Sequence, residues 1–304
     1  MSGQSKRDFL DLAEQDAAVL QGILNEIERV KRGDVDLSAA LNGKTVLMMF
    51  EKPSTRTRVS LETAVKQMGG STIVLSPNDS QLGRGESVAD TARVLSRYVD
   101  VIALRTHDHA KLAEMARYAT VPVINLLSEW SHPCQLIADL LTLKERFGAL
   151  EGRKIAWSGD GNNVLHSWLQ AAAFFGFELA VACPDERAPD PKVIEWAKAA
   201  GAKITIHRDP AEAVAAADAV VTDTWVSMGD EEDAPSLHKI LAAYRVDARL
   251  RAQANPAAIF LHCLPAKRGS GVTAVVIDGP QSVVWDEAEN RLHANKGILA
   301  WCTA

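Results

Sequence analysis

The chain has 304 residues, of which 47% are hydrophobic and 24% are charged, and its formal net charge of -6 argues against a sequence-independent nucleic-acid binder, which needs a basic face. Its four cysteines form no CxxC pair, which disfavours a disulfide framework, and no signal-peptide pattern opens the chain. No window reaches the roughly 20 apolar residues that span a bilayer, so we expect a cytoplasmic protein with reduced thiols.

The first half of the chain begins with a helical pattern and then alternates between strands and helices. Apolar residues from Phe9 to Val30 recur at helical spacing and predict one amphipathic helix that ends near Gly33. Short runs rich in β-branched residues predict strands at Thr45–Glu51, Thr72–Ser76, Val101–Arg105 and Val121–Leu126. Helices are expected near residues 55–68, 86–98 and 109–118, followed by a longer helix at Pro133–Phe147.

The second half repeats this alternation. Strands are predicted at Lys154–Ser158, Leu179–Ala182, Lys203–Ile206, Ala219–Thr222 and Ala257–His262, and helices near residues 163–175, 191–200 and 210–217. The segment Gly229–Pro235 is expected to be a solvated loop. The pattern predicts an α/β fold with two doubly wound parallel-sheet domains, residues 1–148 and 149–286, and a C-terminal helix of about 287–304 that packs back on the first domain.

Polar residues gather where the predicted strands end, and ligands of open α/β sheets bind at such ends. In the first half these are Ser54–Arg58, Arg105 and His132; in the second half they are Asn162, Asn163, Asp223, His262 and Cys263. We therefore expect the active site in the cleft between the two domains.

The segment Ser54-Thr55-Arg56-Thr57-Arg58 stands at the predicted start of a helix. Free backbone N–H groups and the helix dipole favour an anion there, and arginine adds donors that match phosphate oxygens. The segment lacks the spacing of a Walker P-loop. A phosphate cradle is thus one interpretation, and a hydroxyl-capped helix with exposed arginines is the other.

Five ordered motifs resolve this choice, because together they resemble the aspartate and ornithine carbamoyltransferases from about residue 8 to residue 301. The motifs are the SxRTR segment at Ser54–Arg58, the HPxQ segment at His132–Gln135, the DxxxSMG loop at Asp223–Gly229, the HCLP segment at His262–Pro265 and the AENR segment at Ala288–Arg291. The resemblance implies transfer of the carbamoyl group of carbamoyl phosphate to the side-chain amine of L-ornithine, giving citrulline in arginine metabolism.

For carbamoyl phosphate, the resemblance assigns the phosphate to the side chains and amides of Ser54, Thr55, Arg56 and Thr57. Arg105 and His132 would contact the carbamoyl oxygen, where negative charge develops in the reaction, and Gln135 would contact the carbamoyl NH2. The resemblance also places Gln81, Cys263, Leu264 and Arg291 at this ligand. Outside the family context, His132 is interpreted as a helix cap or surface residue, and Arg291 as a helix-surface ion pair with Glu287.

Gln81 lies in a polar, glycine-bearing loop that, by resemblance, reaches the active site of a neighbouring subunit. We therefore expect a homotrimer or a multiple of it. The aspartate enzymes place a lysine in this region, and no lysine occurs between Lys66 and Lys111, which disfavours aspartate as the acceptor. The alternative for the loop is a flexible surface turn.

For ornithine, the resemblance assigns the α-carboxylate to Asn163, helped by Asn162. Asp223 and Ser227 would hold the α-ammonium, with the backbone of Met228. Gly159 and Gly161 precede these asparagines and weakly suggest a dinucleotide-binding turn, but the third glycine of that fingerprint is replaced by Val164.

An Asp223–Cys263 pair beside the reacting amine also matches the ornithine enzymes. An amine with an ordinary pKa of about 10.4 is almost fully protonated at pH 7, so the site must select its neutral form. We expect Cys263 and Asp223 to orient this amine and influence its proton. The alternative is that Cys263 is only a small packed residue.

No cysteine or histidine cluster has metal-ligand spacing, and His107 and His109 are interpreted as surface residues. The expected chemistry needs no metal or organic cofactor, because carbamoyl phosphate is already activated. Three rival functions remain. The first is the same transfer to aspartate, putrescine or an acylated ornithine, the second is a nicotinamide-dependent oxidoreductase, and the third is a non-catalytic protein that binds carbamoyl phosphate or a partner.

Overall fold

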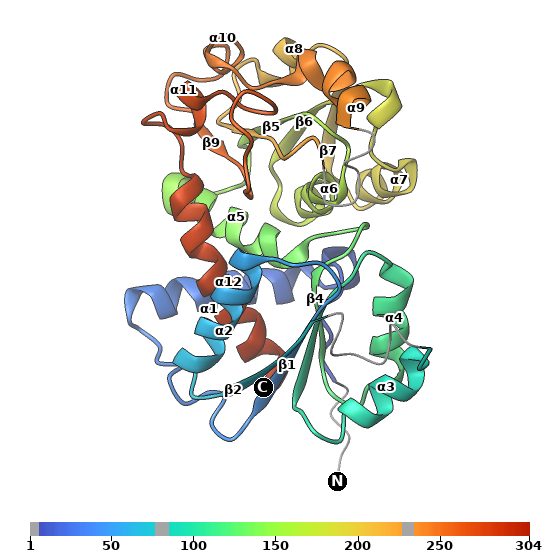
Figure 1. Ribbon diagram of the computed structural model, residues 1–304. Coiled ribbons are helices and arrows are strands. Elements are labelled where there is room, and N and C mark those ends of the chain that lie inside the picture. The colour runs from blue at the N-terminus through green and yellow to red at the C-terminus, as the bar shows by residue number, and fades with distance from the viewer. Residues whose placement is uncertain (1–5, 77–84, 227–233) are drawn as a thin grey trace. The chain divides into compact units, whose positions relative to one another are not determined.

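The computed structural model describes residues 6–76, 85–226 and 234–304. The chain forms two compact units, Met1–Leu141 with Asn290–Ala304 (the first unit) and Thr142–Glu289 (the second unit), each built on a parallel sheet (Figure 1). The predicted α/β class with two parallel sheets is confirmed. The units divide within helix α5 (Pro133–Phe147), a few residues before the predicted domain limit, and residues 290–304 belong to the first unit.

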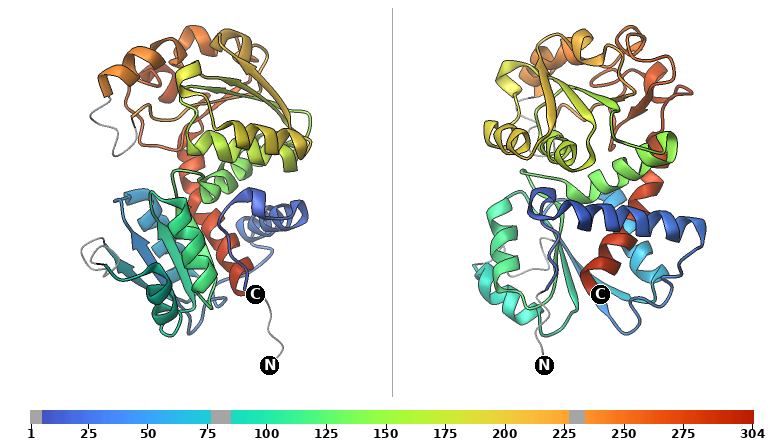
Figure 2. Two further views of the ribbon diagram at one scale, coloured as in Figure 1. Left: turned by 90° about the vertical axis from the view of Figure 1, so that its right-hand side faces the viewer. Right: turned by 180° about the vertical axis from the view of Figure 1, so that it is seen from behind.

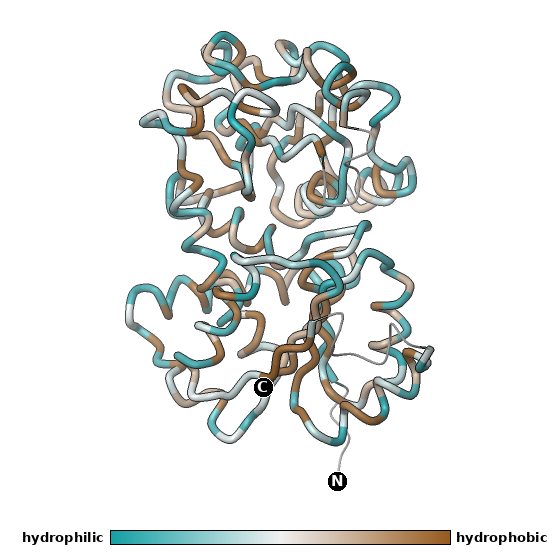
Figure 3. Tube along the Cα trace, viewed as in Figure 1, coloured by the Kyte–Doolittle hydropathy of each residue, from teal (hydrophilic) through white to brown (hydrophobic). Residues whose placement is uncertain are grey.

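The first unit has a four-stranded sheet in the order β2-β1-β3-β4. Its strands are β1 (Thr45–Phe50), β2 (Ser71–Leu75), β3 (Val101–Arg105) and β4 (Val123–Leu127). Strands β1 and β3 are buried almost throughout and do not alternate in burial, because helices cover both faces. Figure 3 accordingly shows hydrophobic chain along the strands of this unit.

Two groups of helices cover this sheet. Helices α3 (Val88–Leu95) and α4 (His109–Tyr118) pack on one face, where they share an apolar cluster with Leu47, Ile102 and Leu104. Helices α1 (Ala17–Arg32), α2 (Thr55–Gln67) and the C-terminal part of α12 (Val284–Thr303) lie on the other side (Figure 1). Figure 2 shows α1 beside α12, and a Cβ added at Gly297 would lie 2.3 Å from Cγ1 of Ile27.

The N-terminal segment corrects one sequence prediction. Phe9 and Leu10 do not belong to the first helix, which begins only at Ala17, and Leu12 lies in a short 3-10 helix, Leu12–Glu14. Phe9 instead extends the sheet, since its N–H donates to the carbonyl of Val123 at 2.9 Å and its carbonyl accepts from the N–H of Asn125 at 2.9 Å. Its buried side chain lies at this sheet edge and packs edge-on against Trp301 of α12, with 6.2 Å between the ring centroids. The predicted helix end is confirmed at Gly33, whose φ is 81°.

The second unit has a five-stranded sheet in the order β7-β6-β5-β8-β9. Its strands are β5 (Lys154–Ser158), β6 (Glu178–Ala182), β7 (Lys203–His207), β8 (Ala219–Val221) and β9 (Ile259–Leu261). Its predicted helices are α6 (Asn163–Phe175), α7 (Pro191–Ala199) and α8 (Pro210–Val214). Apart from the N-terminal helix, the predicted elements match observed ones with ends shifted by no more than three residues.

Three short helices of the second unit were not predicted: α9 (Ala234–Leu241), α10 (Ala248–Arg251) and α11 (Ala274–Ile277). Pro235 lies in α9, so the predicted loop is wrong at its end, and residues 229–233 of that loop lie outside the described residues. Among the helices in the described ranges, none is both long and apolar enough to cross a membrane.

Candidate active site

The predicted phosphate segment lies directly after β1, at the start of α2. The Ser54 hydroxyl caps this helix by accepting from the Thr57 N–H at 3.4 Å, and it also donates to Oγ1 of Thr57 at 3.0 Å. Arg56 is half-buried, Thr55 is exposed and Arg58 pairs with Glu62 on the exposed face. The helix therefore has its hydroxyl cap, and the first backbone N–H groups of a helix are the donors that favour an anion at this end.

A buried arginine joins this helix start to two other helices of the first unit. Arg291 of α12 is 5% exposed, and its Nη2 donates to Oγ1 of Thr57 at 2.8 Å. Its Nη1 donates to Oε1 of Gln135 in α5, while Nε2 of Gln135 donates to Asp139 at 2.7 Å. The surface-ion-pair interpretation of Arg291 is therefore wrong, because the side chain is buried. The sequence analysis missed Asp139, which orients the Gln135 amide.

His132 is close enough to Arg105 and Arg291 for both positive charges to affect its ionisation. Arg105 ends β3 and is 8% exposed, and His132 is 4% exposed just before α5. Burial, then Arg291 and Arg105, holds the pKa of His132 well below its ordinary value of 6.5. Its imidazole is therefore neutral at pH 7 and offers one N–H donor. The burial contradicts the interpretation of His132 as a surface residue.

In the second unit, the predicted asparagines lie at the start of α6. Asn162 caps the helix, since its Oδ1 accepts from the N–H groups of Val164 at 3.0 Å and Leu165 at 3.2 Å. Its Nδ2 donates to Oδ2 of Asp223 at 2.7 Å. Asn163 is the first residue of α6 and is partly exposed. The helix cap and the carboxylate contact together fix the orientation of the Asn162 amide.

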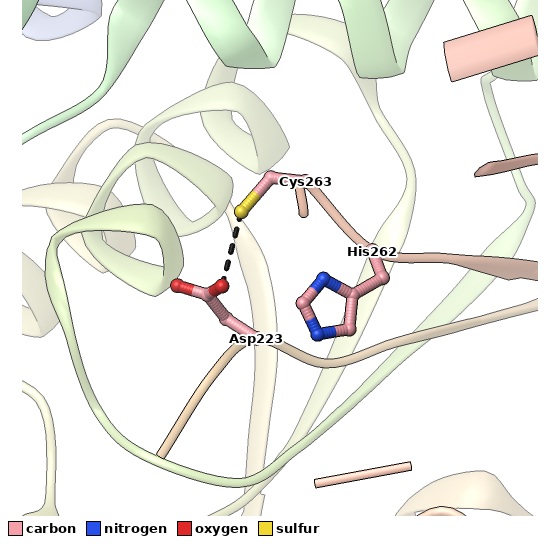
Figure 4. A group of neighbouring side chains, drawn as sticks. All are labelled: Asp223, His262 and Cys263. Atoms are coloured by element: carbon pink, nitrogen blue, oxygen red, sulfur yellow. Dashed lines mark hydrogen bonds between the residues drawn. The ribbon is translucent and has the colours of Figure 1, made fainter. Parts of the chain in front are cut away.

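Asp223 and Cys263 follow the neighbouring strands β8 and β9, which explains why residues 40 positions apart meet. The Cys263 thiol donates to Oδ1 of Asp223 at 3.0 Å (Figure 4), and the Thr224 N–H donates to the same oxygen at 2.7 Å. With Asn162 on Oδ2, both oxygens of this buried carboxylate are held in place. Leu264, next in the chain, has a φ of 58° and a cis peptide bond to Pro265.

Figure 4 also shows His262 beside this pair. One possible metal-ligand atom from each of Asp223, His262 and Cys263 lies within 4.8 Å of the others, and these are ligand types that zinc accepts. The sequence expectation of no metal cluster missed this group, because the residues come from two separate strand ends. Nδ1 of His262 accepts from the Leu264 N–H at 2.9 Å, so that nitrogen is already engaged within the protein.

The glycines before Asn162 have a structural reason that differs from dinucleotide binding. A Cβ at Gly161 would lie 2.3 Å from the nitrogen of Pro189 and 2.4 Å from the carbonyl oxygen of Arg187. Gly161 therefore allows the turn to pack against another segment of the backbone. Val164, at the position of the missing third glycine, is 3% exposed. Gln81, Ser227 and Met228 lie outside the described residues.

Two family models match consecutive parts of the chain. The carbamoyl-P binding domain of aspartate/ornithine carbamoyltransferase matches residues 7–145, and the Asp/Orn binding domain of the same family matches residues 151–302. The chain belongs to the aspartate/ornithine carbamoyltransferase family. The carbamoyl-P domain match corresponds largely to the first unit and the Asp/Orn domain match largely to the second, although the latter match continues into residues 290–302 of the first unit.

Individual family members agree over nearly the full length. Ornithine carbamoyltransferase of Rhodopseudomonas palustris strain CGA009 is 54% identical over 99% of this chain and 98% of its own, and that of Bradyrhizobium diazoefficiens is 55% identical over 98% of each. The structure of ornithine carbamoyltransferase from Pyrococcus furiosus has a TM-score of 0.93 at 47% identity, covering 99% of this chain and 98% of that chain. The structure of an N-acetyl-L-ornithine transcarbamylase has a TM-score of 0.85 at 32% identity, and the match covers 97% of this chain and 99% of that chain.

Proposed function

We propose that the protein transfers the carbamoyl group of carbamoyl phosphate to the side-chain amine of L-ornithine, giving citrulline and phosphate. Curated relatives at 53–55% identity over nearly the whole chain support this activity. The structural observation that supports it most directly is the buried Asp223 carboxylate held by Cys263 and Asn162, which provides an anionic acceptor for a cationic amino acid.

The first unit is proposed to bind carbamoyl phosphate. Ser54, Thr55, Arg56 and Thr57 are expected to hold the phosphate at the start of α2, and Arg291 adds a guanidinium that already reaches Thr57. Attack at the carbamoyl carbon places negative charge on its oxygen. Arg105 and the neutral His132 supply donors for that oxygen, and Gln135 orients the carbamoyl NH2.

The second unit is proposed to bind ornithine. Asn163, with Asn162, is assigned to the α-carboxylate, while Asp223, Ser227 and Met228 are assigned to the α-ammonium. The reacting amine must lose its proton before its lone pair attacks, since a protonated amine is not a nucleophile. The new C–N bond then forms as the bond from the carbamoyl carbon to the phosphate oxygen breaks. Cys263 and Asp223 are proposed to orient the amine, and Cys263 and Leu264 to contact the carbamoyl group.

A homotrimer or a multiple of it is part of the proposal, because Gln81 is assigned to the site of a neighbouring subunit. We further propose a cytoplasmic role in arginine metabolism. Sedimentation combined with an activity assay tests the assembly, and a catalytically competent monomer contradicts it.

The decisive experiment measures carbamoyl transfer from carbamoyl phosphate to L-ornithine, L-aspartate, putrescine and N-acetyl-L-ornithine in parallel. The acetylated acceptor is included because a related structure carries that substrate in its name. We expect turnover with ornithine and the release of one phosphate per citrulline. Turnover with a different acceptor overturns the assignment of Asp223 and the asparagines but retains that of the phosphate residues. A folded protein without turnover on any acceptor contradicts the proposal.

A further inference from the structure

The turn that carries Asn162 is attached to a second segment of the same unit, residues 187–190. Asp160 in this turn is 3% exposed, and its carboxylate accepts two hydrogen bonds from Arg187: Nε to Oδ1 at 2.7 Å and Nη2 to Oδ2 at 2.8 Å. The Asp160 carbonyl also accepts from the Trp157 indole N–H at 3.1 Å. A buried carboxylate requires such a partner, and the two-point geometry fixes its direction as well as its charge.

The backbone makes a second attachment. The Gly161 N–H donates to the carbonyl of Arg187 at 2.8 Å, and the approach of the two chains is so close that a Cβ on Gly161 would lie 2.5 Å from the carbonyl carbon of Ala188. The turn and residues 187–189 are therefore in direct backbone contact, so a shift of one displaces the other.

A third attachment lies within the first turns of α6. His166 is 7% exposed, and its Nε2 accepts from the Asp190 N–H at 3.1 Å. A ring nitrogen that accepts a hydrogen bond carries no proton, so this contact requires Nε2 in its unprotonated form. The start of α6 is thus held on both sides of Asn162 and Asn163, by Asp160–Gly161 before them and by His166 after them.

These three attachments reach the reacting groups through one side chain. Asn162 donates to Oδ2 of Asp223 at 2.7 Å, and Asp223 in turn accepts from the Cys263 thiol at 3.0 Å. A displacement of the turn therefore moves the Asn162 amide and changes the direction of the Asp223 carboxylate. The reaction rate is sensitive to such a displacement, since a misplacement of about 1 Å can lower the rate about a hundredfold.

We propose that Asp160, Arg187 and His166 are positioning residues for the amino-acid acceptor, which hold the turn of Asn162 and Asn163 in register with Asp223. This inference rests on the proposed function, because it assigns these three residues to the acceptor side of that reaction. The alternative is that the Asp160–Arg187 pair only stabilises the fold, in which case its loss affects both substrates alike.

The test compares steady-state kinetics of Arg187→Gln and Arg187→Lys with those of the wild type, varying ornithine and carbamoyl phosphate separately. Arg187→Gln removes the two-point pairing and is expected to raise the KM for ornithine about tenfold or more, without changing the KM for carbamoyl phosphate. Arg187→Lys keeps the charge and loses the planar fork, so an intermediate increase is expected.

The chain offers a matched control near this segment, since Asp185 lies two residues before Arg187. Arg208 pairs with Asp185 through Nε at 3.3 Å and Nη2 at 2.6 Å, but both side chains are largely exposed and neither contacts the Asn162 turn in the described residues. Arg208→Gln therefore removes a similar pair and is expected to leave both KM values unchanged. An increase in the KM for ornithine in this control contradicts a specific role for Arg187.

A pair of variants at His166 tests the third attachment independently and decides the question if Arg187→Gln does not fold. His166→Gln retains an acceptor for the Asp190 N–H and is expected to keep the KM for ornithine near that of the wild type, whereas His166→Leu removes the acceptor and is expected to raise it. Folded variants with unchanged KM values, or with equal changes for both substrates, overturn the inference. A wild type that makes no citrulline overturns the proposed function instead, so the two failures are distinguishable.

Discussion

In the first unit, the candidate site residues come from helices and a strand end and include two buried arginines, whereas in the second unit they come from turns after neighbouring strands and surround a carboxylate. Arg105 and Arg291 make the first group cationic, and Asp223 makes the second group anionic. An anion such as carbamoyl phosphate suits the first group, and an amino acid with two ammonium groups suits the second. The comparison teaches that each unit can be tested with one substrate alone.

Asp223→Asn is expected to have the largest effect and to impair only the acceptor half of the site, the residues of the second unit that are proposed to bind ornithine. The substitution keeps the shape of the side chain but removes the charge and one acceptor for Cys263 and Asn162. We expect kcat/KM for ornithine to fall about a thousandfold, within the range of a lost proton-transfer group. Carbamoyl phosphate should still protect the first unit against thermal unfolding, because a ligand stabilises the state that binds it.

Asp209→Asn is the matched control for this charge removal. Asp209 accepts from the Ala211 N–H at 2.9 Å at the start of α8, and asparagine caps a helix equally well. Its activity should equal that of the wild type. If Asp223→Asn also abolishes protection by carbamoyl phosphate, the two units do not bind their substrates independently, which contradicts the comparison between them.

Arg291→Lys is the corresponding test of the donor half. One guanidinium contacts both Thr57 and Gln135, and a single ammonium does not reproduce that planar, two-armed geometry. We expect the KM for carbamoyl phosphate to increase about tenfold to a hundredfold, since hydrogen bonds to charged groups contribute about 1.5–3 kcal/mol. Arg58→Lys, on the exposed face of α2, is the control and should leave the KM for carbamoyl phosphate unchanged. A larger effect on the KM for ornithine would contradict the assignment.

The regular elements of the fold were predictable because hydrophobic runs and their periodicity are local properties of the chain. Strand β3 was located correctly at Val101–Arg105, and α5 at Pro133–Phe147, since each is a long or continuous apolar pattern with clear ends. Phe9 shows the limit of this method. Its spacing to later apolar residues fits a helix, but the side chain is buried at the sheet edge beside Ile124, and local spacing contains no information about such a tertiary neighbour.

The candidate site was predictable residue by residue only through its motifs, and the contacts between motifs were mostly not. Asp223 and Cys263 were expected to pair from the family resemblance, and the hydrogen bond between them agrees with that expectation. The links from Arg291 to Thr57 and from Arg187 to Asp160 join positions 234 and 27 residues apart, so they depend on the fold. No motif contained Arg187, which is why the sequence analysis missed the support for Asn162.

Cys263→Ser sharpens the description of the acceptor half with a smaller expected effect. Serine keeps a donor for Asp223 but is shorter and less polarizable than the thiol, so we expect kcat to fall about tenfold, with no change in the KM for carbamoyl phosphate. Cys183→Ser, a buried cysteine of the same unit, is the control for the same exchange. Unchanged kcat and KM for ornithine would exclude the thiol from the mechanism and favour its interpretation as a small packed residue.

The smallest effect is expected from pH, and it concerns the donor half. Burial, Arg291 and Arg105 hold the pKa of His132 well below 6.5, whereas the unfolded chain has the ordinary value. The unfolded state therefore binds more protons between the lowered pKa and about 6.5, and the free energy of unfolding falls as pH decreases through that range, by at most about 1.4 kcal/mol per pH unit. Above this range, His132 contributes no pH dependence.

His132→Gln should make the free energy of unfolding less dependent on pH in this range, as measured by denaturant titration at several pH values. Removal of the largely exposed His107 by His107→Gln is the matched control. If the His132 variant keeps the full pH dependence, proton uptake occurs elsewhere, and burial with the two arginines does not hold the imidazole neutral. If the dependence is lost, burial together with the charges of Arg291 and Arg105 keeps the imidazole neutral. The same two guanidinium groups that we propose to bind carbamoyl phosphate then also preserve the single N–H donor that we propose for the carbamoyl oxygen.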